Sequence, residues 1–174
     1  VQSCLVRCGV NYDLIRTEAP GQAIDLACEA ASDGYRRVVA MGGDGTANEV
    51  TNGLLYSEKG HQVTLGIIPA GSGNDFAYAV GIPGNAEGAC RRLAEGRERV
   101  VDVGQVTVDG ESRIYNYGVG IGFDADALLE TRKMTQPRGF LMYLWAVMRV
   151  LATDGRWPYP MRITVDGRPM PHRA

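Results

Sequence analysis

The sequence predicts an α/β fold, in which a three-layer domain with a parallel sheet is followed by the start of a mostly antiparallel β-sandwich domain. Two observations lead to this prediction. Apolar runs without polar alternation, such as 38–41 and 65–68, are separated by helical patterns through the first hundred residues, as in parallel strands that helices cover on both faces. Past Asp102, short strand-like runs flank Asp-Gly pairs at 109–110 and 166–167, and such pairs favour tight antiparallel hairpins.

The first domain is expected to span residues 1–102. Residues 10–16 have the composition of a strand, and small and apolar residues recur at helical spacing over 21–32 before a stop at Gly34. The other expected elements of this domain are a strand at 38–41, a helix at 46–56, a strand at 65–68, and helices at 74–80 and 86–95.

The second domain is expected to span residues 103–174. A hairpin is expected over 106–119, helices over 124–134 and 140–152, and a second hairpin from residue 163 onward. The chain begins without Met and ends without a closing element. We therefore expect it to be a fragment of a longer protein.

Composition limits the classes of function. A net charge of -2 at pH 7 gives no general attraction to polyanions, so we expect no nucleic-acid partner. The four cysteines include no CxxC pair, which favours free thiols in a reducing cytoplasm. The longest apolar run, at 140–148, has nine residues and is far shorter than the ~20 residues that span a bilayer. These features predict a cytoplasmic protein.

The stretch MGGDGTANE, at 41–49, directly follows a predicted buried strand. Its glycines allow a sharp turn and leave backbone N–H groups uncovered, and the N-terminus of the following helix adds positive potential. Both features suit a phosphate. Asp44 suits it only if a cation such as Mg²⁺ lies between its carboxylate and the phosphates. Thr46 and Glu49 have the spacing of a capping box, which predicts that the helix starts at this loop. The stretch therefore predicts a site for a metal-bound nucleotide.

Two better-known phosphate loops are excluded. A Walker A loop needs Gly-Lys-Ser/Thr, but the first lysine of the chain is Lys59. The dinucleotide fingerprint GxGxxG would need a glycine where Asn48 stands.

A second loop of the same design follows in IIPAGSGNDFA, at 67–77. It again passes from a strand through glycines to a helix, and Ser72 and Asp75 repeat the capping-box spacing. Because ligands of open α/β sheets bind beyond the carboxyl ends of the strands, we expect the two loops to converge. Asp44 and Asp75 would then be neighbours, and a cation or a proton would have to offset their repulsion.

The strings GGDGTANEV at 42–50 and PAGSGNDFA at 69–77 resemble the catalytic domain of the diacylglycerol kinase family. The bacterial soluble lipid kinases are a closer match than the eukaryotic diacylglycerol or sphingosine kinases. The resemblance extends to 17–21, 101–104 and 116–124. GGDGT alone is less specific, because NAD kinases and 6-phosphofructokinases share it or a near form, but the second loop disfavours an NAD kinase.

The resemblance implies transfer of the γ-phosphate of ATP to a lipid hydroxyl, of diacylglycerol type, with Mg²⁺ held through water by three carboxylates at the domain interface. Serine at 72 replaces the more usual threonine of the family and keeps the hydroxyl. The implied metal residues are Asp44, Asp75 and Asp102. The predicted cofactor-binding residues are Thr17, Gly42, Gly43, Asp44, Gly45, Thr46, Ala47, Asn48, Glu49, Gly71, Ser72, Gly73 and Asn74.

Two parts of the family pattern are not found. The family begins with a strand and an Asn-Pro-x-x-Gly loop, so the first domain is expected to lack its first strand. The family's general base lies in an Asp-Gly-Glu motif near the C-terminus. Asp109-Gly110-Glu111 has the same letters, but it follows Asp102 closely and is better explained as a hairpin turn. We therefore assign no catalytic base and expect weak or no turnover from residues 1–174 alone.

Other interpretations stay open. Thr17, Thr46, Glu49, Ser72 and Asp75 have a simpler interpretation as helix caps. The protein could also be an NAD kinase-type phosphotransferase or a nucleotide-binding protein without turnover.

The expected partner is a lipid substrate at a membrane surface, and a homodimer is left open. The basic and apolar stretch 128–149 suits contact with an anionic membrane. An interior helix of the second domain explains the part at 140–151 as well, and it is favoured. The sequence does not identify the lipid.

Overall fold

The computed structural model describes residues 1–134, 140–153 and 161–170. The chain divides into two compact units, Val1–Val119 and Gly120–Ala174, which are described separately. The domain boundary expected at residue 102 is not tested by this division into compact units, and it stays a prediction.

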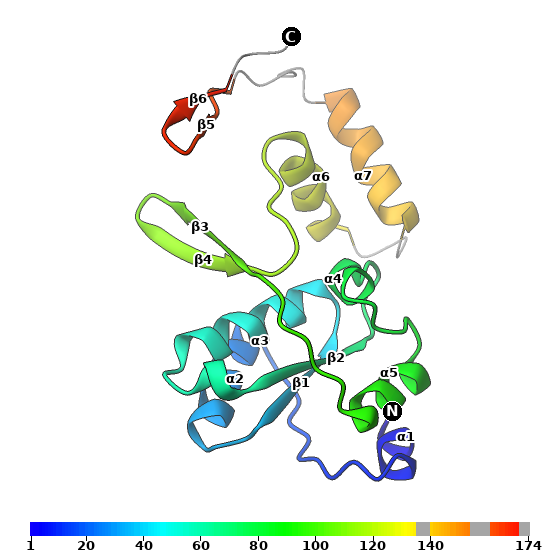
Figure 1. Cartoon of the computed structure of the whole chain (residues 1–174). Coiled ribbons are helices and arrows are strands. Elements are labelled where there is room, and N and C mark those ends of the chain that lie inside the picture. The colour runs from blue at the N-terminus through cyan, green and yellow to red at the C-terminus, as the bar shows by residue number, and fades with distance from the viewer. Residues whose placement is uncertain (135–139, 154–160, 171–174) are drawn as a thin grey trace. The chain divides into compact units, whose positions relative to one another are not determined.

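The first unit is a mixed α/β structure around a parallel sheet (Figure 1). Its elements in chain order are α1 (Gln2–Arg7), α2 (Gln22–Ser32), β1 (Arg37–Gly42), α3 (Asp44–Tyr56), the 3-10 helix η1 (Gly60–Gln62), β2 (Thr64–Pro69), α4 (Asp75–Ala79), α5 (Ala86–Glu95), β3 (Gly104–Val108) and β4 (Glu111–Tyr115).

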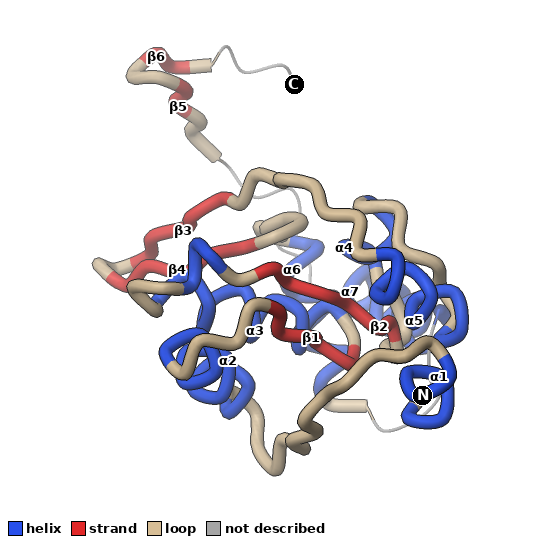
Figure 2. The backbone as a smooth tube through the Cα atoms, turned by 60° about the horizontal axis from the view of Figure 1, so that its bottom comes forward, coloured by secondary structure: helices blue, strands red, loops and turns tan. Residues whose placement is uncertain are grey.

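Strands β1 and β2 lie side by side and run parallel (Figure 2). Their register places Arg37 opposite Thr64 and Gly42 opposite Pro69, so the two strands end at the same edge of the sheet. The predicted parallel pairing is confirmed, and the element bounds agree with the expected strands to within a residue at each end.

Helices cover both faces of this sheet. Ile67 and Ile68 are successive residues of β2, so their side chains point to opposite faces. Ile67 packs with Ala40 and with buried residues of α2 and α3, whereas Ile68 packs with residues of α1 and α5, including Cys90. Helix α3 packs closely against α2 at Gly53, where glycine leaves room for the carbonyl of Ile24. A Cβ at this position would collide with that carbonyl. The first unit is therefore three layers deep.

The strand expected at 10–16 is wrong. These residues have no regular secondary structure, and the N–H of Val10 bonds back to the carbonyl of Leu5 at the end of α1. Leu14 and Ile15 are exposed, and the described residues offer no strand beside them. Strand-like composition is insufficient without a partner strand to take up the backbone hydrogen bonds.

The predicted hairpin around Asp109-Gly110 is confirmed. Strands β3 and β4 pair antiparallel, with Val108 opposite Glu111. The φ angles of Asp109 and Gly110 are 52° and 85°, and both lie in the left-handed region, as a type I′ turn requires. The Asp-Gly-Glu letters at 109–111 are therefore a turn and the first residue of β4.

The second unit contains α6 (Phe123–Arg132), α7 (Phe140–Thr153) and the short strands β5 (Thr164–Val165) and β6 (Arg168–Pro169). The two helices pack through Ala127, Ala146 and Val150, which are buried. Strands β5 and β6 form a second Asp-Gly hairpin. The β-sandwich stays a prediction, because each sheet of the described residues has two strands.

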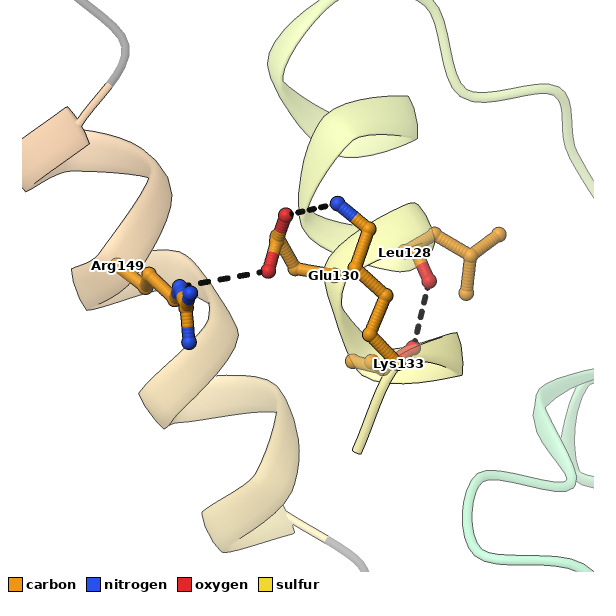
Figure 3. A network of polar contacts seen from close by, with 5 residues as sticks. Leu128, Glu130, Lys133 and Arg149 are labelled. Atoms are coloured by element: carbon orange, nitrogen blue, oxygen red, sulfur yellow. Dashed lines mark hydrogen bonds and ion pairs between the residues drawn. The ribbon is translucent and has the colours of Figure 1, made fainter. Parts of the chain in front are cut away.

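Glu130 of α6 is the centre of a polar network between the two helices (Figure 3). Its carboxylate pairs with Lys133, which directly follows α6, and, at 3.5 Å, with Arg149 on α7. The guanidinium carbon of Arg149 also lies 5.5 Å from the centroid of the Trp145 ring. The network therefore joins α6 and α7 through charges at their exposed surface.

Many apolar side chains of α7 are exposed, among them Leu144, Trp145 and Met148. In the described ranges, no helix combines the length and the apolar content needed to cross a membrane.

Candidate functional site

The two glycine loops meet at the edge where β1 and β2 end. The N–H of Ala70 bonds to the carbonyl of Gly42 at 2.8 Å, which continues the strand pairing beyond the sheet. A Cβ on Gly43 would lie 3.1 Å from the Cα of Gly71, and a Cβ on Gly71 would collide with the Cα of Gly43. The loops therefore touch backbone to backbone, and the convergence expected from the sequence is observed.

Asp44 connects the two loops. It is the first residue of α3, and its Oδ1 accepts the N–H of Phe76 in the first turn of α4 at 3.0 Å. A Cβ on Gly73 would lie 3.1 Å from Oδ2 of Asp44 and 3.6 Å from Oδ2 of Asp75. The two carboxylates therefore flank Gly73, as the sequence predicted for neighbouring acids.

The capping box expected at Thr46 and Glu49 is wrong. Helix α3 begins two residues earlier, with Gly43 as its N-cap and no capping side chain. The Thr46 side chain packs against Gly42, where a Cβ would collide with its hydroxyl oxygen. Glu49 instead accepts the N–H of Gly21 at 3.0 Å. Because Gly21 lies just before α2, this bond ties the start of α2 to α3.

The second expected capping box, from Ser72 to Asp75, is also wrong. The N-cap of α4 is Asn74, whose φ of 62° lies in the left-handed region, which asparagine tolerates better than most residues. Its Oδ1 accepts the N–H of Gly71 at 2.9 Å, and its Nδ2 donates to the carbonyl of Gly71 at 2.8 Å. Asn74 therefore closes the second loop, while Ser72 between the glycines is exposed.

The predicted site residues fall into three groups. The first group lies in the two adjoining loops and at the ends of the strand and helices next to them. It comprises Gly42, Gly43, Asp44, Gly45, Thr46, Gly71, Ser72, Gly73 and Asp75. The second holds the surrounding structure: Ala47 is buried in the core, and the side chains of Asn48, Glu49 and Asn74 bind backbone groups of the chain. The third group, Thr17 and Asp102, lies exposed in irregular segments. Binding by any of these residues stays a prediction.

The chemistry of the loops fits part of a magnesium site. Mg²⁺ commonly takes one or two carboxylates together with phosphate oxygens and water, and Asp44 and Asp75 supply two carboxylates around Gly73. Among the described residues, no group of three or more histidine, cysteine or acidic side chains is placed to hold a metal ion. The participation of Asp102, and Mg²⁺ itself, stay predictions.

Asn52 is a residue that the sequence analysis missed. It is fully buried on α3, and its side chain bonds to the backbone of Ile114 in β4. The available signal was a pair of asparagines four residues apart, Asn48 and Asn52, which places both on one face of a helix. A polar pair on the face next to an apolar stripe indicates a buried hydrogen-bonding role.

A cavity of about 340 Å³ lies elsewhere in the first unit. Its lining includes Arg37 and Thr64, which begin β1 and β2, and Arg92 of α5. The glycine loops follow the opposite ends of these strands, so this cavity is separate from the candidate site.

Comparisons with known proteins place the chain in a family. The family model of the diacylglycerol kinase catalytic domain matches residues 1–106. A protein of Klebsiella pneumoniae (strain 342) named "Probable lipid kinase YegS-like" is 34% identical over 137 residues, which cover 78% of this chain and 44% of that protein. A "Diacylglycerol kinase" of Staphylococcus aureus (strain JH9) is 39% identical over 102 residues, which cover 59% of this chain and 32% of that protein.

A solved structure of a diacylglycerol kinase from Bacillus anthracis str. Sterne is similar as well, with 31% sequence identity and a TM-score of 0.56. The match covers 64% of this chain and 37% of that one. The chain therefore spans less than half the length of these relatives. Because the family model covers more than half of the chain, the chain belongs to the diacylglycerol kinase catalytic domain family.

Proposed function

We propose that the protein to which this chain belongs transfers the γ-phosphate of ATP to a hydroxyl group of a lipid, of diacylglycerol type, with the help of Mg²⁺. The observation that supports this proposal most is the backbone contact between the two glycine loops, at Gly43 and Gly71, with Asp44 bonded across it. A surface made of backbone and small side chains, with an acid at its centre, suits the phosphates of a metal-bound nucleotide. The kinase names of the relatives support the same reaction class.

In this proposal the chain positions the nucleotide and offsets its charge. Backbone N–H groups at the start of α3 face the phosphates because glycine leaves them uncovered, and the helix adds positive potential at its N-terminus. The hydroxyl groups of Thr46 and Ser72 donate hydrogen bonds to phosphate oxygens. Asp44 and Asp75 would hold Mg²⁺, which would supply positive charge beside the phosphates.

The lipid acceptor is supported by the second unit. Leu144, Trp145 and Met148 of α7 are exposed, and the basic side chains Lys133 and Arg149 lie on the same helix pair. Aromatic and apolar side chains beside basic ones suit the interface of an anionic membrane. We propose that this surface brings the protein into peripheral contact with the membrane that holds its substrate.

The experiment that tests the proposal uses the complete reading frame to which residues 1–174 belong. The protein is incubated with Mg²⁺ and γ-labelled ATP, and mixed lipids and NAD are offered in parallel. Label in the organic phase is the expected result. Label on NAD would instead assign the loops to an NAD kinase activity. No transfer by a protein that binds ATP would leave a nucleotide-binding protein without turnover.

Asp44→Asn provides a sharper test of the metal. Asparagine keeps an oxygen for the N–H of Phe76 but removes the charge that would hold Mg²⁺. We expect Mg²⁺ to stop strengthening ATP binding, so that affinity in Mg²⁺ falls by about tenfold or more, or at least ~1.4 kcal/mol. Affinity without Mg²⁺ should equal or exceed that of the wild type, because the lost charge no longer repels the phosphates. Titration calorimetry with and without Mg²⁺ measures both values.

The matched control is Asp25→Asn, which removes an exposed carboxylate from α2. It should leave both affinities unchanged. If Mg²⁺ strengthens ATP binding by Asp44→Asn as much as it does for the wild type, Asp44 does not hold the metal.

A further inference from the structure

The side chain of Asn52 is fully occupied by hydrogen bonds although it is fully buried. Its Nδ2 donates to the carbonyl of Ile114 at 2.9 Å and to the carbonyl of Asn48 at 2.8 Å. Its Oδ1 accepts the N–H of Ile114 at 3.0 Å and the hydroxyl of Tyr56 at 3.2 Å. Buried side-chain amides normally have hydrogen-bond partners. The amide of Asn52 is unusual because it binds both the N–H and the carbonyl of one residue, Ile114, which is distant in sequence.

Ile114 offers both main-chain groups because of its position in the hairpin. Val108 and Glu111 pair next to the two-residue turn, and pairs in an antiparallel ladder alternate between hydrogen-bonded and non-hydrogen-bonded. Ile114, opposite Gln105, falls at a non-hydrogen-bonded position. Its N–H and carbonyl therefore point away from β3, and the amide of Asn52 pairs with them as a neighbouring strand would.

Two more side chains of α3 bind the same segment. Nδ2 of Asn48 donates to the carbonyl of Ile114 at 3.0 Å. The hydroxyl oxygen of Thr51, itself nearly buried, accepts from Nδ2 of Asn116 at 3.2 Å. We call Asn48, Thr51 and Asn52, together with Ile114 and Asn116, the α3–β4 clamp. The clamp fastens the hairpin to the helix that begins at the first glycine loop.

We propose that Asn52 is a positioning residue for phosphoryl transfer. It holds β4, and through the antiparallel pairing of β4 with β3 also β3, at a fixed place relative to the helix that starts at Asp44. Asp102 lies three residues before Gln105, so the clamp restrains the segment that carries this acid as well. The inference rests on the proposed function, in which Asp44 would hold Mg²⁺, and on the predicted role of Asp102 as a further metal residue.

The test compares Asn52→Asp with the wild type in the complete protein. Aspartate keeps the shape and the acceptor for the N–H of Ile114, but when ionised it has no donor for the carbonyl. We expect kcat to fall by about tenfold or more, with KM for ATP changed by less than about threefold. Amide hydrogen exchange at Ile114 should become about tenfold faster or more, because the strand is no longer held. Asn52→Ser, which is shorter and uncharged, replaces it if the buried acid prevents folding.

Asn85→Ala is the matched control for a simple loss of stability. Asn85 caps α5 by accepting the N–H of Gly88 at 2.7 Å, so its loss weakens the fold at a distance from the loops. The Asn85→Ala variant should keep amide hydrogen exchange at Ile114 and the ratio of kcat to KM close to the wild-type values.

Unchanged kcat in an Asn52 variant whose Ile114 amide exchanges faster would overturn the inference. The inference would also be overturned if the Asn52 variant lost kcat and ATP affinity in parallel, and if Asn85→Ala showed the same two losses at an equal loss of stability. Asn52 would then have only a structural role. A wild-type protein that transfers no phosphate to lipid would overturn the proposed function, and the inference with it. The wild-type assay therefore separates the two failures.

Discussion

Gly71 has no room for a side chain, because its Cβ would collide with the Cα of Gly43 in the other loop. The requirement is mutual, since a Cβ on Gly43 would lie 3.1 Å from the Cα of Gly71. Neither glycine has a φ angle in the left-handed region. Close approach of two backbones, rather than an unusual turn conformation, therefore explains why glycine stands at both positions.

Gly71→Ala should destabilise the protein by about 1–3 kcal/mol, as overpacking in a rigid place does. The measurement is urea unfolding of the complete protein. Gly84→Ala is the control, because a Cβ there would meet nothing within 4 Å, and we expect a change within about 1 kcal/mol. Equal effects of the two substitutions would contradict the backbone contact.

The sequence predicted which residues lie at the site better than it predicted their hydrogen-bond partners. The glycines and Asp44 were assigned to converging loops because strand, glycine and helix follow one another in both motifs. The two capping boxes failed because the spacing of a hydroxyl and an acid is a local signal. The actual partner of Glu49, the N–H of Gly21, is distant in sequence, so no local pattern could indicate it.

The charge of Glu130 links α6 to α7 through its ion pair with Arg149. The hydrogen bond from Lys133 lowers the pKa of Glu130, partial burial opposes this shift, and the charges of Lys133 and Arg149 add to the lowering. A carboxyl whose pKa is lowered by folding contributes stability that is present above the unfolded pKa of about 4.3 and is lost as pH falls through the folded pKa. Acid should therefore loosen the helix pair.

The fluorescence of Trp145 can report this loosening, because Arg149 lies over its ring and also pairs with Glu130. Trp157 is the other tryptophan of the chain, so the variant Trp157→Phe leaves Trp145 as the single emitter. In this variant we expect a change in Trp145 emission below about pH 4.3. Glu130→Gln should show the acid form of the emission already at neutral pH. Glu87→Gln, which breaks an exposed ion pair with Arg91 on α5, should leave the acid transition in place; loss of the transition in that control would contradict the assignment.

At the scale of elements, local patterns were most reliable where burial and turn chemistry agreed. The Asp109-Gly110 turn could be predicted because few residue pairs adopt two consecutive left-handed conformations. Helix α1 was missed because six residues are too few to show a helical period. The strand at 10–16 failed because strand formation depends on a partner that the sequence of the segment does not contain.

The chain of 174 residues spans between about a third and less than half of the length of its relatives. We expect residues 1–174 alone to bind ATP but to transfer phosphate weakly or not at all, because no described residue is assigned as general base. Single-turnover transfer from labelled ATP, compared with the complete protein, measures the difference.

Asp109→Asn completes this comparison. Asparagine also tolerates the left-handed conformation of the turn, so we expect no change in transfer by the complete protein. Lipid phosphorylation by residues 1–174 that Asp109→Asn abolishes would show that the turn is catalytic after all.

The backbone contact between the glycine loops has a consequence for folding. The loops are joined only after the crossover from β1 through α3 to β2 has closed, and non-local contacts of this kind form late and slowly. We therefore expect the candidate site to form late in folding. A ligand that binds only the native state stabilises it, so ATP, the proposed substrate, would also favour the completion of the fold.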